Sequence, residues 1–142
     1  MGDLDLIEVF IDGLAEPRNP GTGTYGFVVY KEGMKLKEGC GLAGRLVTNN
    51  FAEYEALIQG LLAVREYSAG SVNVMSDSQL LVNQMAGRWK VKKGAYLEKF
   101  KEARKLAETF KSLDFVWIPR EMNQEADKLT RVAYARYASE PM

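Results

Sequence analysis

The order of expected strands and helices is the feature that most constrains how this chain can fold. β-Branched and aromatic residues cluster between Gly-, Pro- and Asp-rich segments, which is typical of strands. The expected strands are residues 7–11, 26–30, 34–41, 72–75 and 115–118. Apolar residues at helical spacing predict a helix after Thr48-Asn49-Asn50 that ends at Gly70, and further helices over residues 78–86, 95–110 and 123–137. The order β-β-β-α-β-α-α-β-α predicts an α/β fold: a five-stranded mixed sheet, three antiparallel strands followed by two parallel ones, flanked by helices.

Two connections in the first part of the chain have distinct compositions. Residues 14–24 are dense in Pro and Gly and are expected to form a loop, whereas Glu32-Gly33 is expected to form a tight turn between the second and third strands. The length of 142 residues fits a single domain over residues 1–142. A hydrophobic content of 46% with 27% charged residues is typical of a globular protein.

Composition also bears on the compartment. No apolar run approaches the roughly 20 residues that a membrane-spanning helix requires, so we expect no membrane partner. The segment Met1-Gly2-Asp3-Leu4-Asp5 carries acids where a secretory signal would carry positive charge, and a lone Cys40 cannot form an internal disulfide. These features favour a cytoplasmic protein, which we expect to be monomeric.

Charge is balanced over the whole chain but not along it. Lys plus Arg and Asp plus Glu number 19 each, so net charge gives no sign of a nucleic-acid partner. Between Arg88 and Lys105, however, eight basic residues stand against Glu98 and Glu102 alone, a local excess of six. Such a segment suits contact with phosphates, and a solvated, Lys-rich helix face explains it equally well.

Four acidic residues stand where an expected strand ends or an expected helix begins: Asp12, Glu53, Asp77 and Asp127. Each has a structural explanation of its own. Asp12-Gly13 could form a turn, Asn50 to Glu53 resembles a capping box, Asp77 could cap the next helix, and Asp127 could complement the dipole of the last helix. None of these structural explanations accounts for the joint pattern. Asp12 and Asp77 follow expected strands, and Glu53 and Asp127 stand at the start of expected helices that could pack beside those strands. In open α/β sheets, sites form at those strand ends.

A glycine pattern in the same region invites another interpretation. Gly21-Thr22-Gly23-Thr24-Tyr25-Gly26 matches the dinucleotide-binding fingerprint, which should follow a strand and open a helix. Here it follows Pro17-Arg18-Asn19-Pro20 and opens a strand-like segment, so the context argues against a dinucleotide site.

The four acids belong to a wider set of short motifs. The chain contains Asp12-Gly13, Asn19-Pro20-Gly21, Thr48-Asn49-Asn50 three residues before Glu53, Asp77-Ser78-Gln79, and Trp117 ahead of the last acid-bearing helix. In this order and context the chain resembles type 1 ribonuclease H, roughly from Ile7 to Tyr137. The resemblance implies a ribonuclease H-like fold and an endonuclease that cleaves the RNA strand of RNA/DNA hybrids.

The resemblance also implies a metal centre. The four acids would bind two Mg²⁺ or Mn²⁺ ions, with Asp12 between both, Glu53 and Asp77 on one side and Asp127 on the other. Mg²⁺ prefers oxygen ligands, which agrees with an all-carboxylate set. Paired ions can activate water and stabilise the charge of phosphodiester hydrolysis, and the products would carry 5′-phosphate and 3′-hydroxyl ends.

Candidate substrate-binding residues follow from the same resemblance. An RNA strand is told from DNA by its 2′-hydroxyl, which both donates and accepts hydrogen bonds. Gly13 permits close approach of backbone, the amides of Asn49, Asn50 and Gln79 can bond in either sense, and Thr48 and Asn19 are candidates for a phosphate of the DNA strand. Trp89 beside Lys90 combines a stacking surface with positive charge. A core position between helices is the alternative for Trp89.

The chain departs from the family in one respect. It contains no histidine, whereas most bacterial and eukaryotic relatives place a mobile histidine before the final acidic helix. The short Pro119-Arg120-Glu121-Met122 segment is similar to the archaeal branch, in which some relatives also cut double-stranded RNA. Arg120 or Glu121 could substitute for the histidine, and an exposed loop pair without a function is the alternative.

Two other functional classes remain open from sequence alone. One is a nuclease of the same fold with another substrate, double-stranded RNA or branched DNA. A proofreading exonuclease would carry a second acid two residues after the first, and that position is Leu14. The other is a non-catalytic nucleic-acid-binding module, which would be expected to lose some of the acids.

Overall fold

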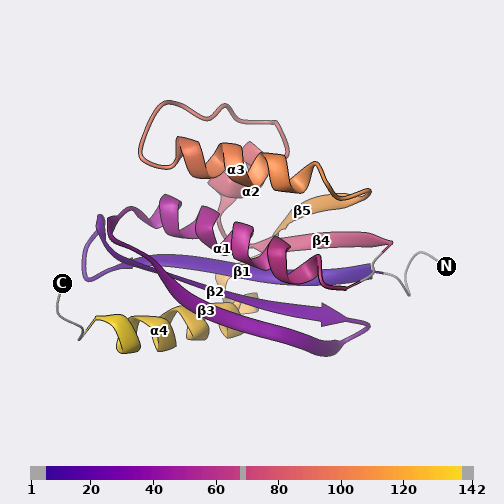
Figure 1. Cartoon of the computed structure of the whole chain (residues 1–142), viewed down its shortest axis with the longest axis horizontal. Helices are drawn as coiled ribbons and strands as arrows, with labels where there is room; N and C mark the ends of the chain where they lie inside the picture. Colours follow the sequence, from indigo (N-terminus) through magenta and orange to yellow (C-terminus); the bar gives the residue numbers. More distant parts are fainter. Residues whose placement is uncertain (1–5, 68–69, 139–142) are drawn as a thin grey trace.

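A central five-stranded mixed sheet forms the framework of the chain in the computed structural model, which describes residues 6–67 and 70–138. The strand order is β3-β2-β1-β4-β5 (Figure 1). The strands are β1 (Leu6–Glu16), β2 (Gly21–Lys31), β3 (Met34–Val47), β4 (Ser71–Ser76) and β5 (Leu113–Trp117). β1 to β3 pair antiparallel, whereas β4 is parallel to β1 and β5 is parallel to β4. The expected sheet is confirmed.

Helices cover both faces of this sheet. They are α1 (Asn49–Val64), α2 (Gln79–Met85), α3 (Leu97–Ala107) and α4 (Gln124–Tyr137), with a 3₁₀ turn, η2 (Arg120–Met122), ahead of α4. α1 packs on β1 and β2, and α3 packs on α1, whereas α4 lies alone against the opposite face of β1 to β3 (Figure 1). Within residues 6–67 and 70–138, no helix combines the length and apolar character needed to cross a membrane.

The core lies mainly between α1 and the sheet. Alternate residues of β1, Ile7, Val9 and Ile11, are fully or almost fully buried and belong to one apolar cluster with Leu57 and Leu61 of α1. This alternation along a strand and the helical spacing in α1 are the two periodicities that the sequence displays. The central position of β1 therefore follows from its buried face.

Several element boundaries differ from the sequence prediction. The loop expected over residues 14–24 is wrong for most of its length, because β1 continues to Glu16 and pairs with β2 from Thr22 onward. Only the Pro-rich residues 17–20 leave the ladder, since proline cannot donate a backbone hydrogen bond. β3 likewise runs beyond Gly41 to Val47. Pairing with a neighbouring strand overrides the weak strand propensity of glycine in both places.

Two helices are shorter than the sequence predicts. α1 ends at Val64 rather than at Gly70, and α3 spans Leu97–Ala107 rather than residues 95–110. The expected turn at Glu32-Gly33 is confirmed: both residues have positive φ (54° and 75°), the conformation that two-residue hairpins favour. The acidic segment Met1 to Asp5 lies outside the described residues.

Candidate active site

Two of the four acids meet because their strands are parallel neighbours. Asp12 lies in β1, one residue after Ile11, which is in register with Ser76 at the end of β4. Asp77 follows Ser76 directly. Both carboxylates therefore emerge at the same edge of the sheet, as the sequence led us to expect for acids that follow strands.

Glu53 reaches the same place from α1. Thr48 caps this helix by accepting a hydrogen bond from the Phe51 N–H at 3.1 Å, which fixes where the first turn begins. β1 and α1 approach so closely that a Cβ on Gly13 would lie 2.3 Å from the main-chain nitrogen of Glu53. Only glycine fits there, and its N–H donates a hydrogen bond to Oε1 of Glu53.

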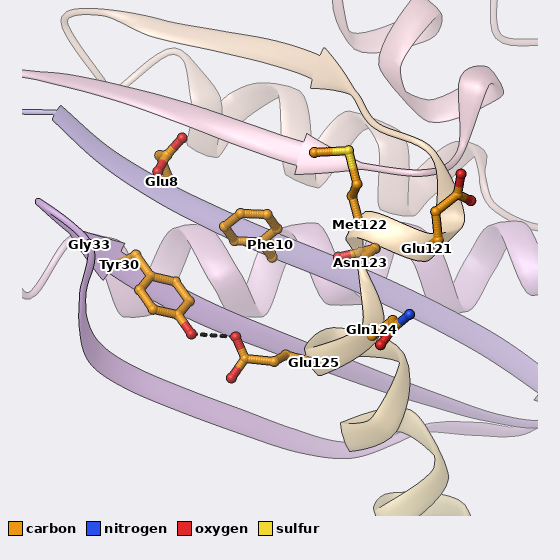
Figure 2. A pocket seen from close by; sticks show the side chains of 9 residues that line it. All are labelled: Glu8, Phe10, Tyr30, Gly33, Glu121, Met122, Asn123, Gln124 and Glu125. Atoms are coloured by element: carbon orange, nitrogen blue, oxygen red, sulfur yellow. Dashed lines mark hydrogen bonds between the residues drawn. The ribbon is translucent and has the colours of Figure 1, made fainter.

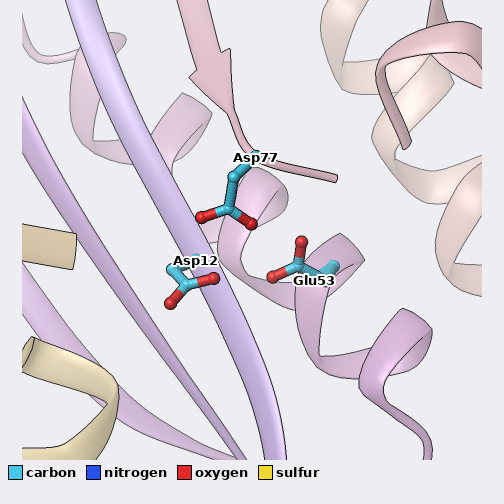
Figure 3. Close-up of side chains that lie close together, drawn as sticks. All are labelled: Asp12, Glu53 and Asp77. Carbon is cyan, nitrogen blue, oxygen red and sulfur yellow. The ribbon is translucent and has the colours of Figure 1, made fainter. Parts of the chain in front are cut away.

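The result is a compact carboxylate cluster. One oxygen from each of Asp12, Glu53 and Asp77 can be chosen so that all three lie within 4.8 Å of one another, and the side chains point toward a common centre (Figure 3). Asp127, in the first turn of α4, lines the same cleft of about 250 Å³. The residues that line this acid cleft are Asp12, Gly13, Leu14, Asn49, Asn50, Glu53, Asp77, Ser78, Arg120, Asp127 and Arg131.

Crowding of these acids makes their charged forms unfavourable. Asp12 is 7% exposed, and burial, followed by repulsion from Asp77, raises its pKa from 3.8 to about 8. Glu53 is equally buried, and burial together with repulsion from Asp12 raises its pKa well above the ordinary value. The Gly13 N–H opposes this by stabilising the ionised form of Glu53. The cluster therefore holds more negative charge than it can stabilise by itself.

This donor set fits a divalent metal ion. It consists of carboxylate oxygens alone, which Mg²⁺ and Mn²⁺ accept, and a cation between them would offset the repulsion that raises the two pKa values. Asp12, Glu53 and Asp77 are placed to contribute directly, and Asp127 faces Asp12 closely enough to raise its pKa further.

The structural explanations for three of these acids do not hold. Ser78, not Asp77, caps α2, since its Oγ accepts from the Leu81 N–H at 3.1 Å. Thr48, not Asn50, caps α1, so Glu53 is not part of a capping box. Asp12 lies within a continuous strand rather than in a turn.

Comparison with known proteins identifies the family. The "Reverse transcriptase-like" family model matches residues 11–133. The bifunctional protein Rv2228c of Mycobacterium tuberculosis is 41% identical over 117 residues, which are 81% of this chain and 32% of that protein. Ribonuclease HI of Halobacterium salinarum is 34% identical over 128 residues, 89% of this chain and 63% of that protein. This chain belongs to the type 1 ribonuclease H family.

Solved structures agree with this assignment. The N-terminal RNase H domain of Rv2228c superposes with a TM-score of 0.87 at 38% identity, covering 94% of this chain and 96% of that one. LC11-RNase H1, isolated from compost by a metagenomic approach, was solved in complex with an RNA/DNA hybrid. It superposes with a TM-score of 0.86 at 37% identity and covers 94% and 99% of the two chains. The matched part of this chain covers only 32% of the length of the curated mycobacterial relatives.

The substrate-facing residues that the resemblance implies for a ribonuclease H divide into two groups. Gly13, Asn49 and Asn50 line the acid cleft itself. Asn49 is held from both sides, because its Oδ1 accepts from the Ala15 N–H at 2.8 Å and its own N–H donates to Oδ1 of Asn19 at 3.0 Å. Asn19 therefore positions the start of α1, next to the cap that Thr48 provides.

The second group lies outside the cleft lining. Gln79 is the exposed first residue of α2, and Trp89 and Lys90 are exposed in the loop between α2 and α3, residues 86–96, called the basic loop below. Trp89 is 47% exposed, so the alternative of a core position is wrong. Its indole ring is therefore accessible from the surface.

The basic segment splits into two halves with different surroundings. On α3, Lys101 pairs with Glu98 at 3.5 Å, as expected for a solvated helix face, whereas Lys99 pairs at 2.6 Å with Glu55, a buried residue of α1. In the basic loop, Lys90, Lys92 and Lys93 are exposed. The uncompensated charge is therefore concentrated in the loop.

The two candidates for replacing the histidine are separated by the fold. Arg120 lines the acid cleft. Glu121 instead lines another pocket, of about 330 Å³, between the sheet and the start of α4 (Figure 2). In that pocket Tyr30 donates a hydrogen bond to Glu125, which also pairs with Lys35 at 2.8 Å. This ion pair lowers the pKa of Glu125.

Two residues whose side chains contact the acids were missed from sequence. Arg131 lines the acid cleft and places its Nε 3.3 Å from Oδ2 of Asp127, and its spacing of four from that acid could have indicated this. Asn123 donates to Oδ2 of Asp77 at 3.0 Å. An asparagine just before a helix is normally interpreted as a cap, so nothing in the sequence indicated that its side chain points inward.

Proposed function

We propose that this chain is a metal-dependent endonuclease that hydrolyses the RNA strand of RNA/DNA hybrids and leaves 5′-phosphate and 3′-hydroxyl ends. The observation that carries the proposal is the cluster of Asp12, Glu53 and Asp77, whose oxygens lie within 4.8 Å of one another. Its support comes from the family and from the structure of LC11-RNase H1 with an RNA/DNA hybrid, which this chain matches at 37% identity.

In this proposal Asp12, Glu53, Asp77 and Asp127 hold two Mg²⁺ or Mn²⁺ ions. Such ions, when bound, supply an activated water and stabilise the charge that develops on the phosphate. The fold of the chain would hold the carboxylates in position around these ions. Burial of Asp12 and Glu53 keeps bulk water from screening the carboxylates, and the Gly13 N–H holds Glu53 with an oxygen toward the cluster.

Substrate choice would rest on polar groups around the cleft. Asn50 lines the cleft and does not cap α1, so its amide would be free to form a hydrogen bond with a 2′-hydroxyl of the bound RNA strand. Asn49 has its Oδ1 engaged with Ala15, which leaves its N–H₂ group as a donor. Trp89 and Lys90 would hold the opposite, DNA strand by stacking and by charge.

The proposal is tested with labelled duplexes of one sequence: RNA/DNA hybrid, double-stranded RNA and branched DNA, each with Mg²⁺ or with EDTA. We expect internal cleavage of the hybrid RNA with Mg²⁺, none with EDTA, and fragments whose 5′ ends are ligation-competent. Asp114→Asn, which changes an exposed acid on β5, is the matched control and should cleave normally. Cleavage that survives exhaustive chelation would contradict the metal-dependent mechanism. A preference for double-stranded RNA would contradict the proposed substrate.

A further inference from the structure

Asn123 occupies the cap position of α4 without acting as a cap. Asparagine is among the preferred residues there because its side chain can accept a backbone N–H of the first turn. Here the side chain makes no such bond, and the residue is 2% exposed. A residue suited to stabilise the helix is therefore turned into the protein, and the contacts it makes there must explain its orientation.

Hydrogen bonds of Asn123 lie at or beside three of the four acids, and the one to Asp77 reaches a carboxylate. Nδ2 of Asn123 donates to the main-chain oxygen of Ile11 at 2.8 Å, directly before Asp12, and to Oδ2 of Asp77 at 3.0 Å. Its main-chain oxygen accepts the N–H of Asp127 at 3.1 Å. The side chain of Asn123 thus connects the middle of β1 with the carboxylate after β4, and its backbone begins the turn of α4 that carries Asp127.

The remaining atom of the amide argues against a purely structural role. Oδ1 is buried and has no hydrogen-bond partner among the described residues. An unpaired buried acceptor lowers stability, so an apolar side chain of similar size would serve packing better at this position. What an apolar side chain could not supply is the N–H₂ group that holds Asp77.

We propose that Asn123 is a positioning residue, which orients the Asp77 carboxylate toward Asp12 and Glu53 so that the three can bind a divalent ion. This rests on the proposed function. A neutral amide suits the task because it fixes the carboxylate without neutralising it, whereas a Lys or Arg at this place would compete with the cation. Groups that orient metal ligands commonly affect metal affinity about 10- to 100-fold.

The test measures binding of Mn²⁺ to the full chain by titration calorimetry, without nucleic acid. Asn123→Ala and Asn123→Leu should each bind Mn²⁺ about tenfold or more weakly than wild type. Asn123→Leu also removes the unpaired Oδ1 and fills its space, so its melting temperature should be the higher of the two. Val64→Ala, a core truncation at the far end of α1, is the control that loses stability while keeping Mn²⁺ affinity.

Hybrid cleavage adds a second measurement. At a Mg²⁺ concentration that just saturates wild type, both Asn123 variants should show a lower kcat, which rises again as Mg²⁺ is increased, while the KM for hybrid changes little. If the Asn123→Leu protein is folded and binds Mn²⁺ as tightly as wild type, the positioning role is overturned and the proposed function is left intact. A wild-type protein that binds Mn²⁺ at none of its acids would overturn both.

Discussion

The acid cleft and the basic loop carry opposite charges and are held by different parts of the fold. Asp12 and Glu53 are buried on a strand and a helix of the core, and the backbones that carry them touch at Gly13. Trp89 and the nearby lysines lie on an exposed connection. Its buried anchors include Gln84, whose Nε2 donates to the Lys90 carbonyl at 3.3 Å and to the Tyr96 hydroxyl at 3.1 Å, and Tyr54, on which Tyr96 stacks.

This difference indicates that the acid cleft and the basic loop have separate roles, the first in chemistry and the second in affinity. Carboxylates that share cations need fixed separations, which packed secondary structure provides. Contacts to a nucleic-acid backbone gain from charge and need less exact placement, so an exposed loop suffices. Changes in the cleft should therefore alter chemistry and stability, whereas changes in the loop should alter affinity.

The largest effect is expected from Asp12→Asn. A neutral amide cannot replace a carboxylate that faces three other acids and, in the proposed function, would hold a cation with them, so kcat should fall by roughly 10³-fold or more. Single-turnover cleavage of a hybrid in Mg²⁺ measures this, with Asp114→Asn as the control. A variant that retains a tenth of the wild-type rate would show that Asp12 is not central.

The pH dependence of stability without metal should follow from the same residue. The folded pKa of Asp12, about 8, exceeds its ordinary 3.8, so the folded state binds the proton more tightly than the unfolded state does. The free energy of unfolding in EDTA should therefore fall as pH rises from about 4 to about 8. Asp12→Asn should flatten this slope and raise the melting temperature at pH 8 by roughly 5 °C or more. A less stable Asn variant at pH 8 would contradict the repulsion.

Binding of a metal ion should relieve the repulsion among the carboxylates, as low pH does. Mg²⁺ at about 100 times its dissociation constant should stabilise the folded state by about 2.7 kcal/mol, since it binds that state alone. Thermal melts at pH 8 with Mg²⁺ or EDTA measure the shift, which Asp12→Asn should largely abolish. The same shift in wild type and variant would mean that the ion binds elsewhere.

The smallest effect is expected in the basic loop. Lys90→Glu with Lys92→Glu should reduce the salt slope of hybrid binding by about 2, because the variant neutralises fewer phosphates and so releases fewer counterions on binding. The rate at saturating substrate should change little. Lys101→Glu with Arg104→Glu on α3 is the matched pair, since these residues already form ion pairs with Glu98 and Glu108. Equal effects of both pairs would remove the distinction between loop and helix.

The sequence predicted the sheet and the meeting of the acids because both depend on patterns that one chain displays. Alternation in β1 and the acids directly after the expected strands, residues 7–11 and 72–75, required no knowledge of distant contacts. The extent of β1 past Asp12 did depend on such contacts, since its continuation beyond Gly13 is a strand only through pairing with β2. The inward orientation of Asn123 was likewise hidden, because it is decided by Asp77, 46 positions away.

The long edge of the sheet has a consequence for how this chain behaves at high concentration. β3 extends over 14 residues at the open side of the sheet, where an unpaired strand can template the addition of another. It carries Lys35, Lys37 and Glu38, and its register with β2 shifts at irregular pairs. Charged side chains and bulges at an edge oppose aggregation, so we expect β3, which gives no residue to the acid cleft, to resist the addition of a strand from another molecule.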